Sequence, residues 1–262
     1  MKMRKRKNKT YDQSLFVVSI MVCWELLART KWFPPLLFPR LTTVLYQLFA
    51  DVKSGEILGR LYFSLYLIAV GLGLAIVTAV IATILALCSP LISNWVQAVM
   101  TILHPLPGIS ILPVIILWLG TGPQSIIAVI WFSSVWPLIT NLHTGLRSVP
   151  VTQIEVGRNL GIKGVGLIRK VLLPGASPYV LTGLRVAWAR AWQASVAAEM
   201  VFGASGGEGG LGWFIYKKRF FMDIPSVFGG MIVIIIVGLI VERLGFEWVE
   251  VRTVRRWGMT QE

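Results

Sequence analysis

The chain has 262 residues, of which 55% are hydrophobic and only 14% are charged, and its formal net charge is +13. A soluble domain of this length needs far more charge on its surface than a chain with a mean hydropathy of +0.72 provides. The apolar residues also fall in runs of roughly 20 residues, which is enough to cross a bilayer, so a soluble globule is excluded.

The basic residues flank the apolar runs instead of forming one patch. Six of the 25 lysines and arginines precede residue 10, a second group lies within 147–170, and a third lies within 243–256. Basic clusters beside apolar runs are the positive-inside signature of an integral membrane protein. We therefore interpret the charge as a determinant of topology and expect no nucleic-acid partner.

The first apolar run, residues 15–27, follows a basic start and could be mistaken for a signal peptide. No small-residue cleavage site follows it, so an uncleaved first span is predicted. Cys23 and Cys88 lie in or at the end of apolar runs. Packing roles are expected for both, and neither a disulfide framework nor a metal site.

Six apolar spans account for the hydropathy pattern and predict an all-α integral membrane protein with a single transmembrane domain over residues 1–262. With the N-terminus in the cytoplasm, the alternation places 15 of the lysines and arginines inside and 8 outside, as the positive-inside rule requires. The outer segments are then 29–60, 120–123 and 204–226, and the inner ones 88–94, 143–178 and the C-terminal tail. The predicted spans are 14–28, 61–87, 95–119, 124–142, 179–203 and 227–246.

The outer segment 29–60 is expected to hold a helix of its own. Pro34, Pro35 and Pro39 break any helix at its start, while apolar residues recur at helical spacing between 44 and 52. A short amphipathic helix lying on the outer face is therefore predicted.

The third span contains His104-Pro105-Leu106-Pro107-Gly108. Prolines remove backbone donors, so the helix is expected to be kinked or broken there. In lipid such a break survives only where it faces protein or a water-filled cavity. It is either a packing kink or part of the substrate path, and His104 is accordingly either a hydrogen-bonded packing residue or a pathway residue.

The fifth span carries a polar and aromatic stripe, because its members are spaced 3, 4, 3 and 4 residues apart: Arg185, Trp188, Trp192, Ser195 and Glu199. Charges in a bilayer avoid lipid. A structural ion pair or interface contact is one reading of the two charged residues. A place in the translocation pathway or its gates is the other, and Trp188, Trp192, Ser195 and Glu199 are candidate pathway residues.

A glycine-rich run follows at 203–212. It has no Gly-Lys-Ser/Thr ending and no preceding strand, so a phosphate-binding loop is not expected. A flexible outer loop is predicted instead.

The longest inner segment between spans contains two apolar-periodic pieces. Residues 151–160 predict a short amphipathic helix with Gly161 as its C-terminal stop. A second piece, 165–173, precedes Pro174. A short surface helix between spans either rests at the lipid interface or fits a partner's groove.

This loop resembles the "EAA" loop of permease subunits of binding-protein-dependent ABC importers, whose form is Glu-Ala-Ala, Gly and Ile-x-Leu-Pro. Glu155-Val156-Gly157, three residues, Gly161, nine residues, Val171, one residue and Leu173-Pro174 keep its full spacing. Val156, Gly157 and Val171 depart from the family form, and Gly157 weakens a helix by up to about 1 kcal/mol relative to Ala. The resemblance implies an ATPase-coupling role for Glu155, Val156, Gly157, Gly161, Leu173 and Pro174.

Within these permeases the chain looks most like the nitrate, sulfonate, taurine and bicarbonate group, on short stretches from Ser54-Gly55-Glu56 to Gly210-Leu211-Gly212. The resemblance implies the six-helix type I importer permease fold, in a bacterial plasma membrane with both termini cytoplasmic. It also implies a homodimer of permeases, two cytoplasmic ATPases that bind ATP and Mg, and an extracytoplasmic substrate-binding protein.

Such a subunit is no enzyme and needs no catalytic residue, cofactor or metal of its own. The expected function is alternating-access import of a small solute, with an anion such as a sulfonate, taurine or nitrate favoured by the subfamily. An aromatic acid or a vitamin precursor is the alternative cargo. An ion-coupled carrier would need buried acids and repeated halves, and a membrane enzyme would need a partner for His104.

Overall fold

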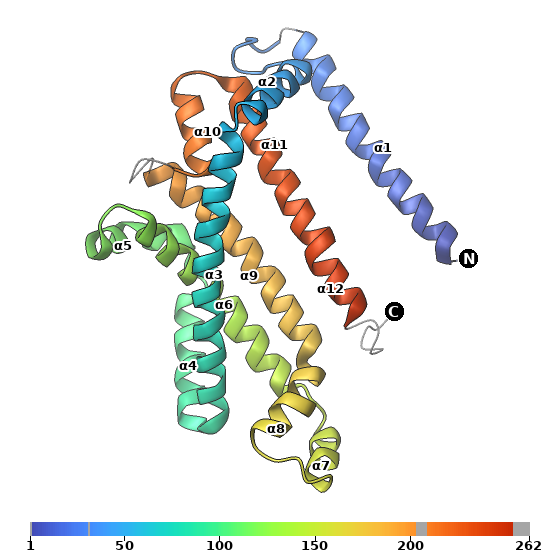
Figure 1. Ribbon diagram of the computed structural model, residues 1–262, viewed down its shortest axis with the longest axis vertical. Helices are drawn as coiled ribbons and strands as arrows, with labels where there is room; N and C mark the ends of the chain where they lie inside the picture. Colours follow the sequence, from blue (N-terminus) through green and yellow to red (C-terminus); the bar gives the residue numbers. More distant parts are fainter. Residues whose placement is uncertain (1, 31, 203–208, 254–262) are drawn as a thin grey trace.

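Helices form every regular element of the residues that the structure, a computed structural model, describes: 2–30, 32–202 and 209–253 (Figure 1). The predicted all-α fold is confirmed. The long helices are α1 (Lys2–Arg29), α3 (Glu56–Cys88), α6 (Pro123–Arg147), α9 (Leu173–Phe202) and α11 (Ile224–Ile240). The shorter ones are α2 (Leu41–Lys53), α4 (Pro90–Leu103), α5 (Leu112–Leu119), α7 (Val151–Asn159), α8 (Val165–Leu167), α10 (Leu211–Phe220) and α12 (Glu247–Arg252). A 3₁₀ turn, η1 (Gly108–Ile111), and two π-helical segments, η2 (Ile168–Leu172) and η3 (Val241–Phe246), connect some of them.

Helix α6 lies at the centre of the bundle, where it packs along both α9 and α3. Two glycines bring these helices close together. A β-carbon on Gly71 of α3 would lie 2.6 Å from Ile130 of α6, and one on Gly145 of α6 would lie 2.6 Å from Tyr179 of α9. Small residues at helix contacts allow the backbones to approach, as is typical of helix packing in membranes.

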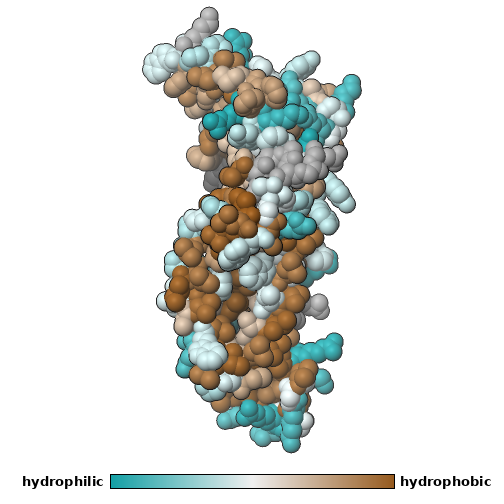
Figure 2. Space-filling model, turned by 90° about the vertical axis from the view of Figure 1, so that its left-hand side faces the viewer, coloured by the Kyte–Doolittle hydropathy of each residue, from teal (hydrophilic) through white to brown (hydrophobic). Residues whose placement is uncertain are grey.

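Among the described residues, three helical segments are long and apolar enough to cross a membrane: Glu56–Cys88, Pro123–Arg147 and Ile224–Arg252. The bent pair Pro90–Leu103 and Gly108–Leu119 makes a fourth if it counts as one span. One face of the molecule shows a broad band of hydrophobic side chains between hydrophilic ends (Figure 2). Neither α1 nor α9 is among these segments, so the six-span map stays a prediction for them.

The third predicted span, 95–119, is broken. Helix α4 ends at Leu103, and the segment from Gly108 to Leu119 leaves it at an angle of 91°. Pro105 and Pro107 prevent a continuous helix. Gly108 seats the break on α6, because a β-carbon there would overlap the hydroxyl of Ser133. The predicted break is confirmed, and α5 projects sideways from the bundle (Figure 1).

Several boundaries differ from the predicted ones. Helix α9 begins at Leu173, six residues before the predicted start at 179, so Leu173 and Pro174 open a long helix instead of ending a loop. The predicted amphipathic helix at 44–52 is α2, and it buries Val44. Cys23 and Cys88 are exposed on the isolated chain, so the predicted packing roles are wrong for this chain by itself.

Different short helices lie at the two ends of the bundle (Figure 1). Helices α2 and α10 lie at one end, and α7 and α8 lie at the other. The N-terminal end of α1 and the C-terminal end of α12 both point toward the α7–α8 end. Helices α3, α6 and α11 run toward the α7–α8 end, and α1 and α9 run the opposite way.

Candidate functional site

Helix α7 is a nine-residue helix that ends where the sequence predicts. Gly161 adopts a left-handed conformation with φ of 76°. Its N–H donates to the carbonyl of Arg158 at 2.9 Å, and the N–H of Ile162 donates to the carbonyl of Gly157 at 3.0 Å. These two bonds form a Schellman cap, which glycine permits at little steric cost.

One face of α7 is fixed to the start of the next long helix. Gly157 is buried, and a β-carbon there would lie 2.9 Å from Val171 of η2 and 3.1 Å from Leu167 of α8. Gly157 and Val171, two of the three departures from the family motif, are therefore in contact. Ile154 also packs on a small apolar cluster that joins α7 to the ends of α6 and α9.

The other face of α7 is exposed. Glu155 is solvent-accessible, and Val156 and Leu160 have exposed fractions of 57% and 74%. Apolar side chains around a carboxylate on a short protruding helix form a surface suited to a partner's groove. Segment η2, against which α7 packs, continues directly into α9, a helix of 30 residues.

The predicted stripe on α9 faces neighbouring helices. Trp192, Ser195 and Glu199 are buried. Trp188 stacks on Trp192 with ring centroids 6.0 Å apart. Arg185 forms ion pairs of 3.0 Å with both Glu242 and Glu250, so the ion-pair reading of this residue is confirmed.

Glu199 joins three helices through its carboxyl group. Its Oε1 accepts a hydrogen bond from the Ser195 hydroxyl at 2.9 Å. Its Oε2 accepts from the Ser64 hydroxyl of α3 at 2.9 Å and from the Gly212 N–H at 2.8 Å. The Ser64 hydroxyl accepts in turn from the Leu211 N–H. The carboxyl group therefore caps the first turn of α10, where a helix dipole favours negative charge.

The glycine-rich segment is only partly described, since 203–208 lie outside the described residues. Gly209, Gly210 and Leu211 are buried. A β-carbon on Gly210 would overlap the Ser64 hydroxyl, and one on Gly212 would overlap the Val196 carbonyl. The predicted flexible loop is therefore wrong for 209–212, which pack against α3 and α9 and begin a helix.

A cavity of about 200 Å³ lies where the broken helix meets α6 and α9. Of the predicted pathway residues only His104 lines it, whereas Trp188, Trp192, Ser195 and Glu199 do not. The other polar lining residues were not singled out from the sequence: Ser133, Trp136, Arg190 and Gln193. The available signal was a second stripe on the fifth span, with Arg190, Gln193, Ala194 and Ala197 at helical spacing.

Arg190 differs from Arg185 in its surroundings. It is exposed, and within the described residues it has no ion pair or hydrogen bond. A charge facing lipid at the bilayer centre costs on the order of 2.5–3.5 kcal/mol on insertion scales, so such a residue faces a polar cavity or a partner. Trp136 lines the same cavity, and its Nε1 atom is buried without an acceptor in the described part of the chain.

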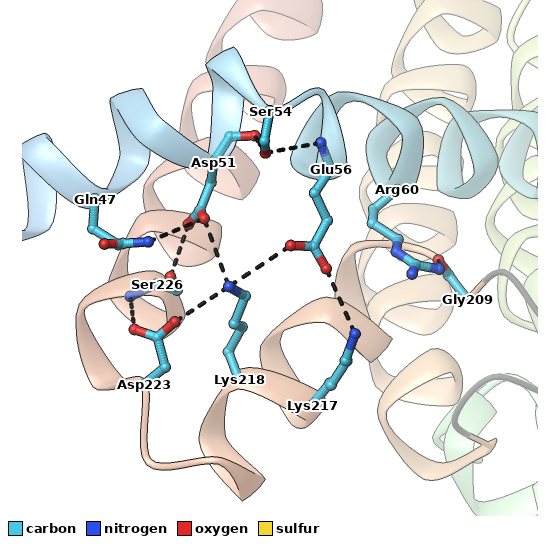
Figure 3. Close-up of polar contacts among 10 residues, drawn as sticks. All are labelled: Gln47, Asp51, Ser54, Glu56, Arg60, Gly209, Lys217, Lys218, Asp223 and Ser226. Carbon is cyan, nitrogen blue, oxygen red and sulfur yellow. Dashed lines mark hydrogen bonds and ion pairs between the residues drawn. The ribbon is translucent and has the colours of Figure 1, made fainter.

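A polar cluster fixes α2 to the helices beside it (Figure 3). Lys218 lies 3.2 Å from Asp223, 3.6 Å from Asp51 and 3.7 Å from Glu56. Asp51 is buried and accepts a hydrogen bond of 2.8 Å from Ser226. Burial alone would lower the pKa of Lys218, but the hydrogen bond to Asp223 and the charges of Asp51, Asp223 and Glu56 raise the pKa above its ordinary value.

The chain matches the family described as "Binding-protein-dependent transport system inner membrane component" over residues 71–246. It is 29% identical over 234 residues to a Bacillus subtilis protein provisionally named aliphatic sulfonates transport permease protein SsuC, covering 89% of this chain and 83% of that one. It is 28% identical over 229 residues to the bicarbonate transport system permease protein CmpB of Synechocystis, covering 84% and 82% respectively.

The fold is similar to a chain of the MetNI methionine ABC transporter solved in an inward-facing conformation. The TM-score is 0.64 at 18% identity, over 80% of this chain and 99% of that one. Among solved proteins, this arrangement of helices is therefore that of a type I ABC importer permease, as the EAA spacing predicts.

Proposed function

Since the chain belongs to the family of inner membrane components of binding-protein-dependent transport systems, we propose that it carries a small anion across the membrane. The chain is a permease subunit of an ABC importer and not an enzyme. Its relatives named for sulfonates and bicarbonate support an anionic cargo. An aromatic acid or a vitamin precursor is the competing cargo.

Type I importer permeases work with ATPase and binding-protein partners. For this chain we propose a pair of identical permeases, two ATPases that bind ATP and Mg, and a binding protein at the α2–α10 end. The membrane is the plasma membrane, and both termini lie on the cytoplasmic side with α7. The direction of α1 and α12 toward the α7–α8 end supports this orientation.

The coupling role is supported by one observation: α7 has one exposed face and one face packed against η2. Its outer face presents Glu155, Val156 and Leu160, while Gly157 on the inner face contacts Val171. When two ATPases close around bound ATP, α7 moves with them as a rigid body. Because η2 runs straight into α9, that movement tilts α9 and changes the side to which the permease pair opens.

Co-purification tests the proposal. A tagged chain extracted from its own membranes is expected to bring down an ATPase subunit. The variants Val156→Asp and Leu160→Asp place charge on the exposed face of α7 and should lose the ATPase. Phe220→Asp is a matched control, because Phe220 is exposed by 73% on α10 at the opposite end. Absence of any ATPase with the unaltered chain would overturn the importer assignment.

A further inference from the structure

We propose that the cavity at the broken helix binds the oxyanion head group of the transported solute. The Arg190 guanidinium supplies the counter-charge, and the indole N–H of Trp136 supplies a second donor. This inference rests on the proposed function, because it gives a location and a set of ligands to the anion that the permease carries.

The position of the cavity follows from the break in the third span. Pro107 and Gly108 turn the chain across α6, and Gly108 sits against Ser133. The turn leaves a space of about 200 Å³ between the break, α6 and α9. A water molecule occupies about 30 Å³ of liquid, so a solute of a few heavy atoms fits, whereas pockets for drug-sized ligands begin at about 300 Å³.

Two of the residues that line the cavity carry donor groups for which the described residues provide no acceptor: Arg190 and Trp136. Arg190 has no hydrogen bond or ion pair within the described residues. The Trp136 Nε1 atom is buried without an acceptor in that same part of the chain. A buried donor is nearly always paired in native proteins, so the unpaired N–H of Trp136 calls for an explanation, whereas the exposed Arg190 is a charge without a counter-ion. An acceptor that enters with the solute pairs both groups, and Gln193 can add an amide N–H.

The charge balance selects an anion over a cation or a neutral solute. Of the residues that the structure describes, no aspartate or glutamate lines the cavity. The acids on α9 and on the adjacent η3 have other partners. Glu199 accepts hydrogen bonds from two hydroxyls and an N–H, and Glu242 forms an ion pair with Arg185. Arg190 is therefore a cation that the neighbouring helices leave unneutralised. A planar guanidinium also matches the paired oxygens of a sulfonate, bicarbonate or nitrate group.

The test uses the complete importer, with its own ATPase and binding protein, in liposomes. Uptake of ethanesulfonate, bicarbonate and nitrate is measured beside ATP hydrolysis. For whichever of these anions the unaltered complex transports, Arg190→Gln is expected to lower uptake by at least about tenfold, because a charge-assisted hydrogen bond is lost. Arg190→Lys keeps the charge and is expected to retain more uptake than Arg190→Gln.

Matched controls separate the site from general damage. Trp136→Phe removes only the unpaired N–H and is expected to lower uptake several-fold. Trp131→Phe, on the same helix, removes an N–H that already donates to Thr78 at 2.9 Å, and should leave uptake within about twofold of the unaltered complex.

Binding to the permease–ATPase complex is measured without the binding protein, by calorimetry with ethanesulfonate and its neutral analogue ethanesulfonamide. Tighter binding of the anion, lost in Arg190→Gln, supports the site. Equal binding of the two solutes would overturn it.

Outcomes that contradict this inference differ from those that contradict the importer. Normal uptake by an Arg190→Gln complex that assembles and hydrolyses ATP would overturn the proposed anion site. It would not contradict the assignment as an importer. If Arg190→Gln does not assemble, Trp136→Phe decides, and unchanged uptake in it overturns the site. Failure of the unaltered complex to transport any of the three anions would overturn both the site and the anionic cargo.

Discussion

Gly157 and Val171 touch where α7 meets η2, just before α9 begins, so closely that a β-carbon on Gly157 would lie 2.9 Å from a methyl group of Val171. The family motif has Ala and Ile at these two positions. The smaller residue at each position lets α7 lie directly on η2. We therefore interpret the two departures from the motif as compensating changes in side-chain volume at one contact.

We expect Gly157→Ala to push α7 away from η2. The alanine favours a helix by up to about 1 kcal/mol, but an added methyl group in a filled contact costs about 1–3 kcal/mol, so the crowding wins. Less solute should then move for each ATP hydrolysed, which a paired assay of uptake and phosphate release measures. Adding Val171→Ala relieves the crowding and should restore the ratio. A double variant as poorly coupled as the single one would contradict the claim that the volumes of residues 157 and 171 compensate for each other.

Gly161→Pro should uncouple transport while the chain remains inserted in the membrane. Proline fixes φ near −65°, whereas Gly161 has φ of 76°, and it removes the N–H that bonds to Arg158. Glu155→Lys should act alike by reversing the exposed charge. Gly166→Ala is the control in the same segment, because the added β-carbon makes only an ordinary contact of 3.4 Å. Normal uptake by a well-expressed Gly161→Pro chain would count against the coupling role.

Glu199→Ala should lower the stability of the permease, because it leaves the Ser64 and Ser195 hydroxyls and the Gly212 N–H without their acceptor. Each buried unpaired donor costs about 1–3 kcal/mol, so a loss of about 3–9 kcal/mol is expected. Ser195→Ala removes a single donor and should cost less. Thermal unfolding of the detergent-purified chain measures both. A Glu199→Ala chain that melts normally but selects different solutes would place Glu199 in the pathway instead.

The attachment of α2 should weaken at strongly alkaline pH. The folded state raises the pKa of Lys218, so the stabilisation is fully present below the ordinary lysine pKa of about 10.4 and is lost as the pH rises through the higher folded value. Lys218→Met should therefore melt earlier than the unaltered chain at neutral pH and show a smaller further decrease between pH 9 and 12. Arg219→Met, an exposed neighbour, provides the baseline. Identical alkaline profiles for the Lys218→Met and unaltered chains would contradict this account.

The sequence predicts α7 well because its signals are local. Gly161 ends the helix by its own backbone freedom, and the spacing to Leu173 and Pro174 is a property of the chain alone. The break at Pro105 and Pro107 is predictable for the same reason, since a missing N–H needs no partner to exert its effect.

The direction in which α9 faces is not predictable in this way. Two stripes on this helix carry polar residues, and only tertiary packing decides that Trp192 and Glu199 are buried while Arg190 and Gln193 line a cavity. Glu199 finds its partner Ser64 at a distance of 135 residues along the chain. The start of α10 was missed because glycines at 209–212 are typical of loops, although here they permit contact with α9.

The charges of α9 also bear on how the chain is made. When synthesis has reached Phe202, Ser64 is already present, but Gly212, Glu242 and Glu250 have not yet been added. If α9 is the fifth span, as the six-span map predicts, it enters the bilayer with Arg185 unneutralised and with part of the Glu199 carboxyl group unpaired. We therefore expect the stable insertion of α9 to depend on residues of α10 to α12, which leave the ribosome later.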